Sequence, residues 1–416
     1  MFYQNSKQLQ NSVIKNSFYL YLSHFADYIL SIIFLPFIAR ILGASEFGKI
    51  ALAQSFGIFI ILILEFGSPL YLTREVARNK ENKSFLMKFI STSLSLKITI
   101  IPIVLILSFL SIIFVPAFSK NPTYLIIVFI GSVAQGFSPA WYFYGLEQIK
   151  TMSLYKFLFR LFGFLLLIIF SNSNEDGWIV LASLSLSSIL ITIFLYIEMI
   201  KQTGFIKLSV SNDIRKLFFK SLNSFYITAV PHIYQNLSIV AMSSFVSPLQ
   251  LGLYFGASRI HRAFNTLFGP LSLAFFPMIS SLNEKNKSLT GSMMRKYSLL
   301  MFCIGLVFFL INFFFTKQII SLLLGNDYSS AKNILIAFSF VFPLTAISNA
   351  LGRQWLMVLN KDHVYSFSQI FSSLAAFLFM IIFIKKIGII AFPFSLIFFE
   401  SLSILIIIIY MIKIKI

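Results

Sequence analysis

Long apolar stretches separated by short polar segments run through the whole chain. A helix that crosses the hydrocarbon core of a membrane needs about 20 apolar residues, with a range of about 17–25. Twelve stretches meet this need and predict twelve membrane-spanning helices, at 16–40, 49–71, 89–115, 124–146, 154–171, 178–199, 222–244, 252–279, 298–316, 333–356, 364–384 and 388–410. The pattern therefore predicts an all-α polytopic membrane protein with no separate soluble domain.

The composition agrees with a membrane setting. Hydrophobic residues make up 58% of the 416 residues and charged residues 11%, whereas soluble domains average about 45–50% and ~25%. This composition excludes a soluble enzyme and a disordered regulator. A disulfide scaffold is excluded as well, since the single Cys303 cannot form an internal disulfide. The 51 phenylalanines are most simply explained as contacts with lipid.

The chain is strongly basic, with 33 Lys and Arg against 14 Asp and Glu. Such an excess suggests nucleic acid in a soluble protein, but in a membrane protein it reflects the retention of basic loops in the cytoplasm. With the N-terminus in the cytoplasm, 23 basic residues lie in cytoplasmic segments and 7 on the opposite face of the membrane. Both termini are therefore predicted to be cytoplasmic, and no nucleic-acid partner is expected.

The two halves of the chain resemble each other, which predicts an internal repeat. Two pairs of segments correspond, Ser17–Tyr19 with Ser224–Tyr226 and Glu46–Ala51 with Gln250–Phe255. Six spans in each half predict two parallel lobes, residues 1–200 and 222–416, joined by the basic cytoplasmic linker 201–221. Substrates of transporters built in this way bind in a central cavity between the repeats.

Polar residues inside the predicted spans call for an explanation, because a charge at mid-bilayer costs about 2.5–3.5 kcal/mol. The first span carries His24 and Asp27 one turn apart, and its repeat counterpart carries His232, Gln235 and Asn236 on one stripe. Both stripes are expected to face the cavity. His24 could also do no more than bond Asp27 or a backbone carbonyl.

Arg259 and Arg262 lie at i and i+3 in the eighth span and share a helix face with Thr266, whereas His261 points away. Two cations on one face repel each other and need anions. A guanidinium group matches the oxygens of a phosphate. We therefore expect this pair to bind an anionic substrate, together with His232, Gln235 and Asn236.

Two acidic residues, Glu65 and Glu400, also lie within predicted spans. With His24 and Asp27 they are candidates for coupling transport to protons or sodium. A purely structural role is open for each: Glu65 and Lys97 could snorkel to helix ends, and Glu400 could pair with a cation. No Walker loop, HExxH, paired Cys/His spacing or GxSxG occurs in the sequence, so neither an enzyme, a metal site nor a cofactor is expected.

Several short motifs are spread along the chain, at Pro36–Gly43 with Glu46–Gly48, Glu65–Gly67, Thr73–Arg78, Trp141–Glu147, Phe276-Pro277, Gly325, Tyr328, Asn349, Gly352 and Gln354. They resemble motifs of the Wzx O-antigen flippases, in the polysaccharide transport branch of the multidrug/oligosaccharidyl-lipid/polysaccharide (MOP) exporters. The more specific ones are Pro36–Gly48, which resembles the family's first-loop signature, and Trp141–Glu147, which resembles the segment after the family's fourth helix.

The resemblance implies a flippase that moves an undecaprenyl-diphosphate-linked oligosaccharide, the O-antigen repeat unit, from the inner to the outer leaflet of the bacterial inner membrane by alternating access. It also implies membrane lipids as partners, with a polysaccharide polymerase and a chain-length regulator as further ones. A drug exporter of the same superfamily is the main alternative, although such exporters favour acidic cavities. A membrane glycosyltransferase and a scaffold fit less well, given the short loops and the buried charges.

Overall fold

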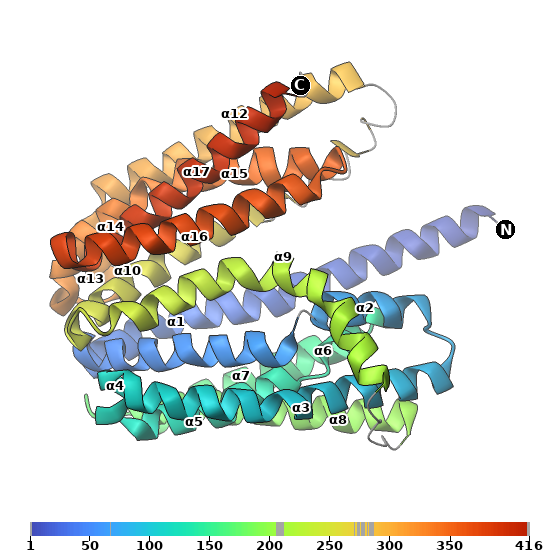
Figure 1. The fold of residues 1–416 in the computed structure, drawn as a ribbon, viewed down its shortest axis with the longest axis horizontal. Coiled ribbons are helices and arrows are strands. Elements are labelled where there is room, and N and C mark those ends of the chain that lie inside the picture. The colour runs from blue at the N-terminus through green and yellow to red at the C-terminus, as the bar shows by residue number, and fades with distance from the viewer. Residues whose placement is uncertain are drawn as a thin grey trace. The chain divides into compact units, whose positions relative to one another are not determined.

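The computed structural model describes residues 2–66, 68–204 and 212–413, except 270, 273, 274, 276–278, 281 and 283–286; side chains are described for these residues outside 2–32, 68, 212, 223, 224, 226–228, 230–232, 287 and 288. Within this part of the chain the regular secondary structure is helical throughout (Figure 1). The predicted all-α polytopic fold is confirmed.

The first half of the chain forms eight helices that cover the first six predicted spans. Short helices lie between the long ones and turn the chain back into the bundle. The bounds are α1 (Phe2–Glu65), α2 (Ser68–Arg78), α3 (Lys83–Phe114), α4 (Pro116–Lys120), α5 (Pro122–Phe137), α6 (Ala140–Gly145), α7 (Ile149–Phe170) and α8 (Gly177–Thr203).

The first two predicted spans, 16–40 and 49–71, are joined by the short segment 41–48. Helix α1 runs through it and breaks only at Gly43, whose φ of 69° and ψ of 171° lie outside the helical region. Residues other than glycine rarely adopt a positive φ. A single glycine therefore turns α1 back on itself as a helical hairpin (Figure 1).

The second half contains four long helices, α9, α12, α16 and α17, and several short ones. The tenth predicted span, 333–356, is divided into two α-helices and a π-helix, η2. The bounds are α9 (Asn212–Met242), α10 (Pro248–Thr266), α12 (Lys287–Phe314), α13 (Thr316–Leu323), η1 (Asn326–Ala331), α14 (Lys332–Ser339), α15 (Val341–Ser348), η2 (Asn349–Leu356), α16 (Asp362–Ile387), η3 (Gly388–Ile390) and α17 (Ala391–Lys413).

The chain divides into two compact units, residues 1–34 with 52–236 and residues 35–51 with 237–416. We name them the N-terminal and the C-terminal unit. The tip of the α1 hairpin therefore belongs to the C-terminal unit, and the chain passes between the units within α9. The division into lobes 1–200 and 222–416 with a linker at 201–221 stays a prediction.

Within the C-terminal unit, the hairpin tip meets α10 at two glycines. A Cβ on Gly48 would overlap the carbonyl oxygen of Pro248, and a Cβ on Gly252 would overlap that of Ala44. The repeat pairs Gly48 with Gly252, and each glycine is in contact with the residue four positions before the other. A reciprocal contact of this kind is what a two-fold relationship between the two segments produces.

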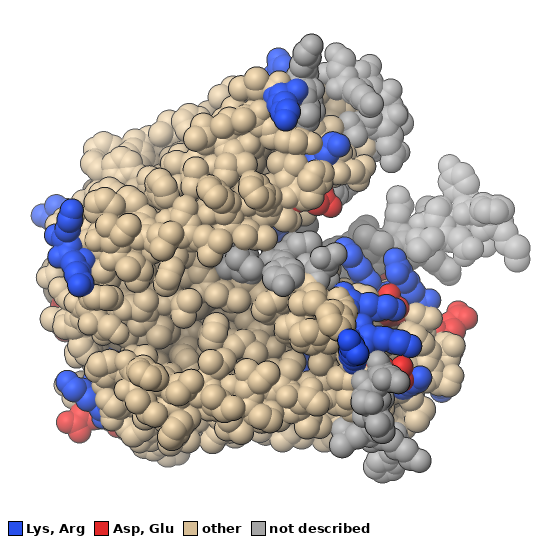
Figure 2. Space-filling view, viewed as in Figure 1, with Lys and Arg blue, Asp and Glu red and all other residues tan. Residues whose placement is uncertain are grey.

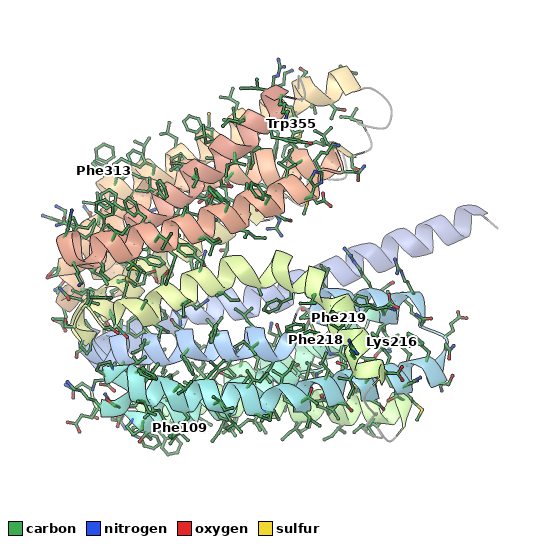
Figure 3. The ribbon with its side chains drawn as sticks, viewed as in Figure 1. Phe109, Lys216, Phe218, Phe219, Phe313 and Trp355 are labelled. Carbon is green, nitrogen blue, oxygen red and sulfur yellow. The ribbon has the colours of Figure 1, made fainter. Side chains whose placement is uncertain are left out.

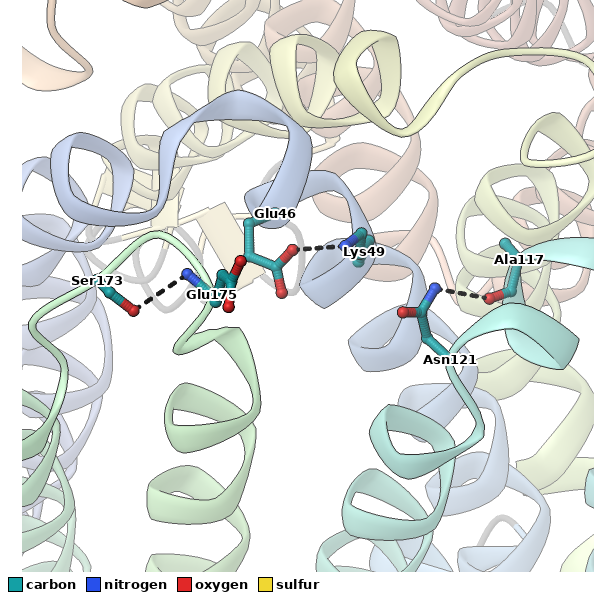
Figure 4. A network of polar contacts seen from close by, with 6 residues as sticks. All are labelled: Glu46, Lys49, Ala117, Asn121, Ser173 and Glu175. Carbon is teal, nitrogen blue, oxygen red and sulfur yellow. Dashed lines mark hydrogen bonds and ion pairs between the residues drawn. The ribbon is translucent and has the colours of Figure 1, made fainter.

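Short-range polar contacts stabilise several connections within each unit (Figure 4). The Lys49 ammonium lies 2.8 Å from a carboxylate oxygen of Glu46, one helical turn away. Asn121 donates from its side chain to the carbonyl of Ala117 at 3.5 Å. The contact from Asn121 satisfies a carbonyl near the end of α4, where backbone groups lose their helical partners.

Many large apolar side chains face outward, as expected for a surface in contact with lipid. Phe109 is 65% exposed on α3, and both Phe109 and Phe313 point away from the ribbon in Figure 3. Eight stretches of the described residues are long and apolar enough to cross a membrane, and two of these exceed 45 residues. The chain is thus a multi-pass membrane protein, and the exact number of twelve crossings stays a prediction.

The charge bias gives a direct prediction about orientation. Alkaline phosphatase fused after Asn174 or Asn326 should be active, because these positions are predicted to be periplasmic, and fusions after Asn82 or Asn360 should be inactive. The four activities are compared at equal abundance of the fusion proteins. Inverted activities at two of the four positions would contradict the cytoplasmic placement of both termini.

Candidate functional site

The arginine pair of the eighth predicted span lies on α10, where both side chains contact one aromatic ring. The guanidinium carbons of Arg259 and Arg262 are 4.9 and 5.4 Å from the centre of the Phe255 ring. Phe255 precedes the two arginines by four and seven residues, so helical periodicity places all three on one face. The expected shared face is confirmed.

Arg262 is exposed and Arg259 is partly buried, so both remain within reach of a ligand. Arg262 also donates to the hydroxyl and the carbonyl of Ser258, each at 3.4 Å. Phe255 is buried and packs edge-on against Phe47 of the hairpin tip, with ring centres 5.4 Å apart. Packing against Phe47 fixes the position of the Phe255 ring beneath the two guanidinium groups. Cations over aromatic faces are stabilised by about 0.5–2 kcal/mol.

His261 lies on the opposite face of α10, as the sequence predicted. It is buried between Phe338 and Phe342, with both ring centres 4.7 Å away. One ring nitrogen is 2.8 Å from the side-chain nitrogen of Asn265. His261 is therefore part of the packing between α10 and the α14–α15 segment.

The polar stripe predicted on the seventh span falls on α9. Gln235 is exposed and Asn236 is buried. The side chains of His232, His24 and Asp27 lie outside the described residues. Cavity-facing roles for these five residues stay predictions.

Glu400 lies buried on α17 within the C-terminal unit. The Thr345 hydroxyl on α15 donates to Oε1 of Glu400 at 2.9 Å, and Ser348 forms a second hydrogen bond. Its other oxygen, Oε2, is buried and has no hydrogen-bond partner among the described residues. One turn later, Ser403 accepts from Gln369 on α16 at 2.9 Å. The sequence did not predict these partners, although Thr345 and Ser348 interrupt an apolar run at helical spacing.

Glu65 and Lys97 meet inside the N-terminal unit. Lys97 is 3% exposed and donates to the carbonyl of Gly136, near the end of α5, at 2.7 Å. Glu65, at the end of α1, is near enough for its charge to act on Lys97. The alternative that Lys97 snorkels to a helix end is wrong, because its ammonium group is bonded inside the unit.

Two of the motifs that carry the resemblance dock against each other. The Thr73 hydroxyl on α2 donates to the carbonyl of Trp141 on α6 at 3.3 Å, and Lys80 forms an ion pair with Glu147. A Cβ on Gly145 would collide with Val76, so only glycine permits this approach. The two motifs therefore build one interface within the N-terminal unit.

The described residues contain no group of three or more His, Cys, Asp or Glu placed to hold a metal ion. The chemistry within reach is electrostatic: a paired cationic surface on α10 and a buried carboxylate on α17. Charged groups within a multi-pass helical fold are typical of substrate and ion pathways in membrane proteins.

The chain belongs to the polysaccharide biosynthesis protein family, whose model matches residues 13–283. It is similar to two proteins named "Putative O-antigen transporter". The one from Escherichia coli (strain K12) is 25% identical over 85% of this chain and 86% of its own length. The one from Shigella dysenteriae is 26% identical over 94% of this chain and 98% of its own.

Solved structures of transporters share the fold. The lipid II flippase MurJ in an inward closed conformation superposes with a TM-score of 0.69 at 15% identity, covering 97% of this chain and 88% of that one. An inward-facing multidrug resistance MATE family transporter of the MOP superfamily gives 0.62 at 15% identity, covering 92% and 97%. The predicted resemblance to the MOP exporters is confirmed.

Proposed function

We propose that this protein is a flippase for an undecaprenyl-diphosphate-linked oligosaccharide, the O-antigen repeat unit. It moves this lipid from the inner to the outer leaflet of the bacterial inner membrane by alternating access. Membership in a polysaccharide biosynthesis family and relatives named as O-antigen transporters support the substrate class. The protein acts as a transporter without catalysing a reaction.

The observation that carries the proposal is the arginine pair over Phe255. A diphosphate offers oxygens at two adjacent phosphorus atoms, and two guanidinium groups one turn apart can each bind one phosphate. A cationic drug would be repelled by the same two charges. The pair therefore favours an anionic lipid over the substrates of a multidrug exporter, which is the alternative function.

The membrane potential supplies part of the driving force. An inside-negative potential of 100 mV favours outward movement of one negative charge by ~2.3 kcal/mol, so a headgroup with two such charges gains roughly 4–5 kcal/mol. We propose that entry of a proton or a sodium ion drives the return of the empty transporter. The buried Glu400, with one carboxylate oxygen lacking a partner among the described residues, supports a cation-binding role.

This role of Glu400 gives a testable prediction. Glu400→Gln keeps the size and the hydrogen bond from Thr345 but removes the charge that a cation would bind. A coupling free energy of about 1–3 kcal/mol corresponds to about 5–150-fold. We expect flipping in proteoliposomes to lose at least fivefold of its stimulation by an inward proton or sodium gradient. Ser403→Ala, one turn away, is the matched control, and an unchanged response of Glu400→Gln would exclude this site.

The function itself is tested in proteoliposomes loaded with undecaprenyl-diphosphate oligosaccharide. The protein should make internal sugar accessible to an external glycosidase, and it should restore O-antigen display to a flippase-null strain. Efflux of cationic dyes without exposure of the sugar would favour the drug exporter.

We propose a polysaccharide polymerase and a chain-length regulator as partners, because the product of flipping is the substrate of polymerisation.

A further inference from the structure

The first three turns of α9 form an amphipathic surface, distinct from the arginine pair on α10. Leu217 and Ser221 are buried, whereas Arg215, Lys216 and Lys220 are exposed. Three cations thus lie on one face of a short helical segment, and the apolar face is turned toward the protein.

The buried face is anchored in the N-terminal unit. The ring of Phe66 stacks on Phe218 and on Phe225, with centres 4.4 and 4.8 Å apart. Phe66 has a φ of 42°, which is uncommon for a residue other than glycine, and it lies where α1 passes into α2. At the start of α9, Lys88 of α3 pairs with Asp213 at 2.9 Å.

That ion pair places a further cation beside the segment. The ammonium group of Lys88 holds the pKa of Asp213 below its usual range, because it stabilises the ionised carboxylate. Figure 1 shows α9 changing direction after these turns, so that they lie across the end of the unit, and Figure 2 shows Lys and Arg gathered at this end. The segment is therefore held in one place and one orientation.

The exposed face contains an aromatic residue among its cations. Phe219 is 58% exposed and lies beneath the guanidinium group of Arg215, at 5.9 Å (Figure 3). The ion pairs of the described residues do not include Arg215, Lys216 or Lys220, although the charge of Lys216 acts on Asp213. An exposed phenylalanine between cations is unfavourable in water, but it fits the membrane interface, where apolar groups enter the acyl boundary and cations meet phosphates.

We propose that Arg215, Lys216, Phe219 and Lys220 form a binding surface for anionic phospholipid headgroups of the cytoplasmic leaflet. The cations bind lipid phosphates while Phe219 inserts between the acyl chains. This surface lies in the predicted cytoplasmic linker, which agrees with the orientation that the charge bias predicts. Retention of basic loops in the cytoplasm accounts for charge, but it does not account for the placement of Phe219 on the charged face.

The test is lipid retention by the purified full-length protein. Native mass spectrometry after reconstitution in mixed phosphatidylglycerol and phosphatidylcholine should show preferential retention of phosphatidylglycerol. A cation near an anionic surface contributes about fivefold to binding. The triple variant R215Q/K216Q/K220Q should therefore lose at least tenfold of this preference, whereas F219S should weaken the retention of both lipids equally.

The matched control is R295Q/K296Q/K413Q, which removes three exposed basic residues that are also predicted to be cytoplasmic. It changes the charge bias equally and should keep the preference for phosphatidylglycerol. Inorganic phosphate should displace the lipid no more than chloride at equal ionic strength. Equal retention of both lipids by the unmodified protein, an unchanged preference in the first triple variant, or specific displacement by phosphate would each overturn the proposal. None of these readouts depends on transport, so a failure here leaves the flippase test independent.

Discussion

Replacing both Arg259 and Arg262 with alanine should abolish O-antigen display in a flippase-null strain. Loss of one charged hydrogen bond costs about 1.5–3 kcal/mol, so each single alanine variant should weaken substrate binding roughly ten- to a hundred-fold. The two effects combine in the double variant, because the two guanidinium groups are the cations brought together over Phe255.

Lysine variants separate charge from geometry at this site. Arg259→Lys or Arg262→Lys keeps the charge and loses the planar fork, so display should recover in part. His261→Gln is a control on the opposite face of the same helix, and membrane abundance of every variant is measured in parallel. Full display by the double alanine variant at normal abundance would assign the arginines to helix packing instead.

Replacing Lys97 alone should destabilise the protein more than replacing Lys97 and Glu65 together. Lys97→Met leaves the carbonyl of Gly136 without its donor and leaves Glu65 without a nearby cation in a buried setting. Removing one of two opposite buried charges leaves the other uncompensated and costs about 3–5 kcal/mol, whereas neutralising both removes that penalty.

The double variant K97M/E65Q should therefore recover most of the stability that K97M loses. The measurement is the thermal unfolding midpoint of detergent-solubilised protein, followed by tryptophan fluorescence. Lys88→Met, an exposed position on the same helix, is the control and should shift the midpoint little. Equal midpoints for K97M and the unmodified protein would mean that the buried pair adds nothing to stability.

Local sequence patterns determined much of this protein. Each predicted span is largely helical where the structure describes the chain, because the apolar period and length of a span act within a single segment. The fourth span, 124–146, is the clearest exception, since α5 ends at Phe137 and α6 begins at Ala140. Helical periodicity likewise placed Arg259 and Arg262 on one face and His261 on the other. The motifs indicated the resemblance to the O-antigen flippases before any packing was known.

Contacts between distant segments could not be obtained in this way. The sequence marked Glu65, Lys97 and Glu400 as unusual, but only the tertiary structure paired Lys97 with Gly136 and Glu400 with Thr345. The sequence likewise did not indicate that a single residue, Gly43, would reverse the chain between the first two spans, with helix on both sides of it.

The repeat shows the division most clearly. The sequence alone paired Gly48 with Gly252 as equivalent positions, because both follow the same short skeleton of residues. Only the tertiary structure shows that the two glycines lie against each other, with no room for a Cβ on either. Sequence similarity records common local conformation, whereas a contact depends on how whole helices pack, and that is decided by every surface in the bundle at once.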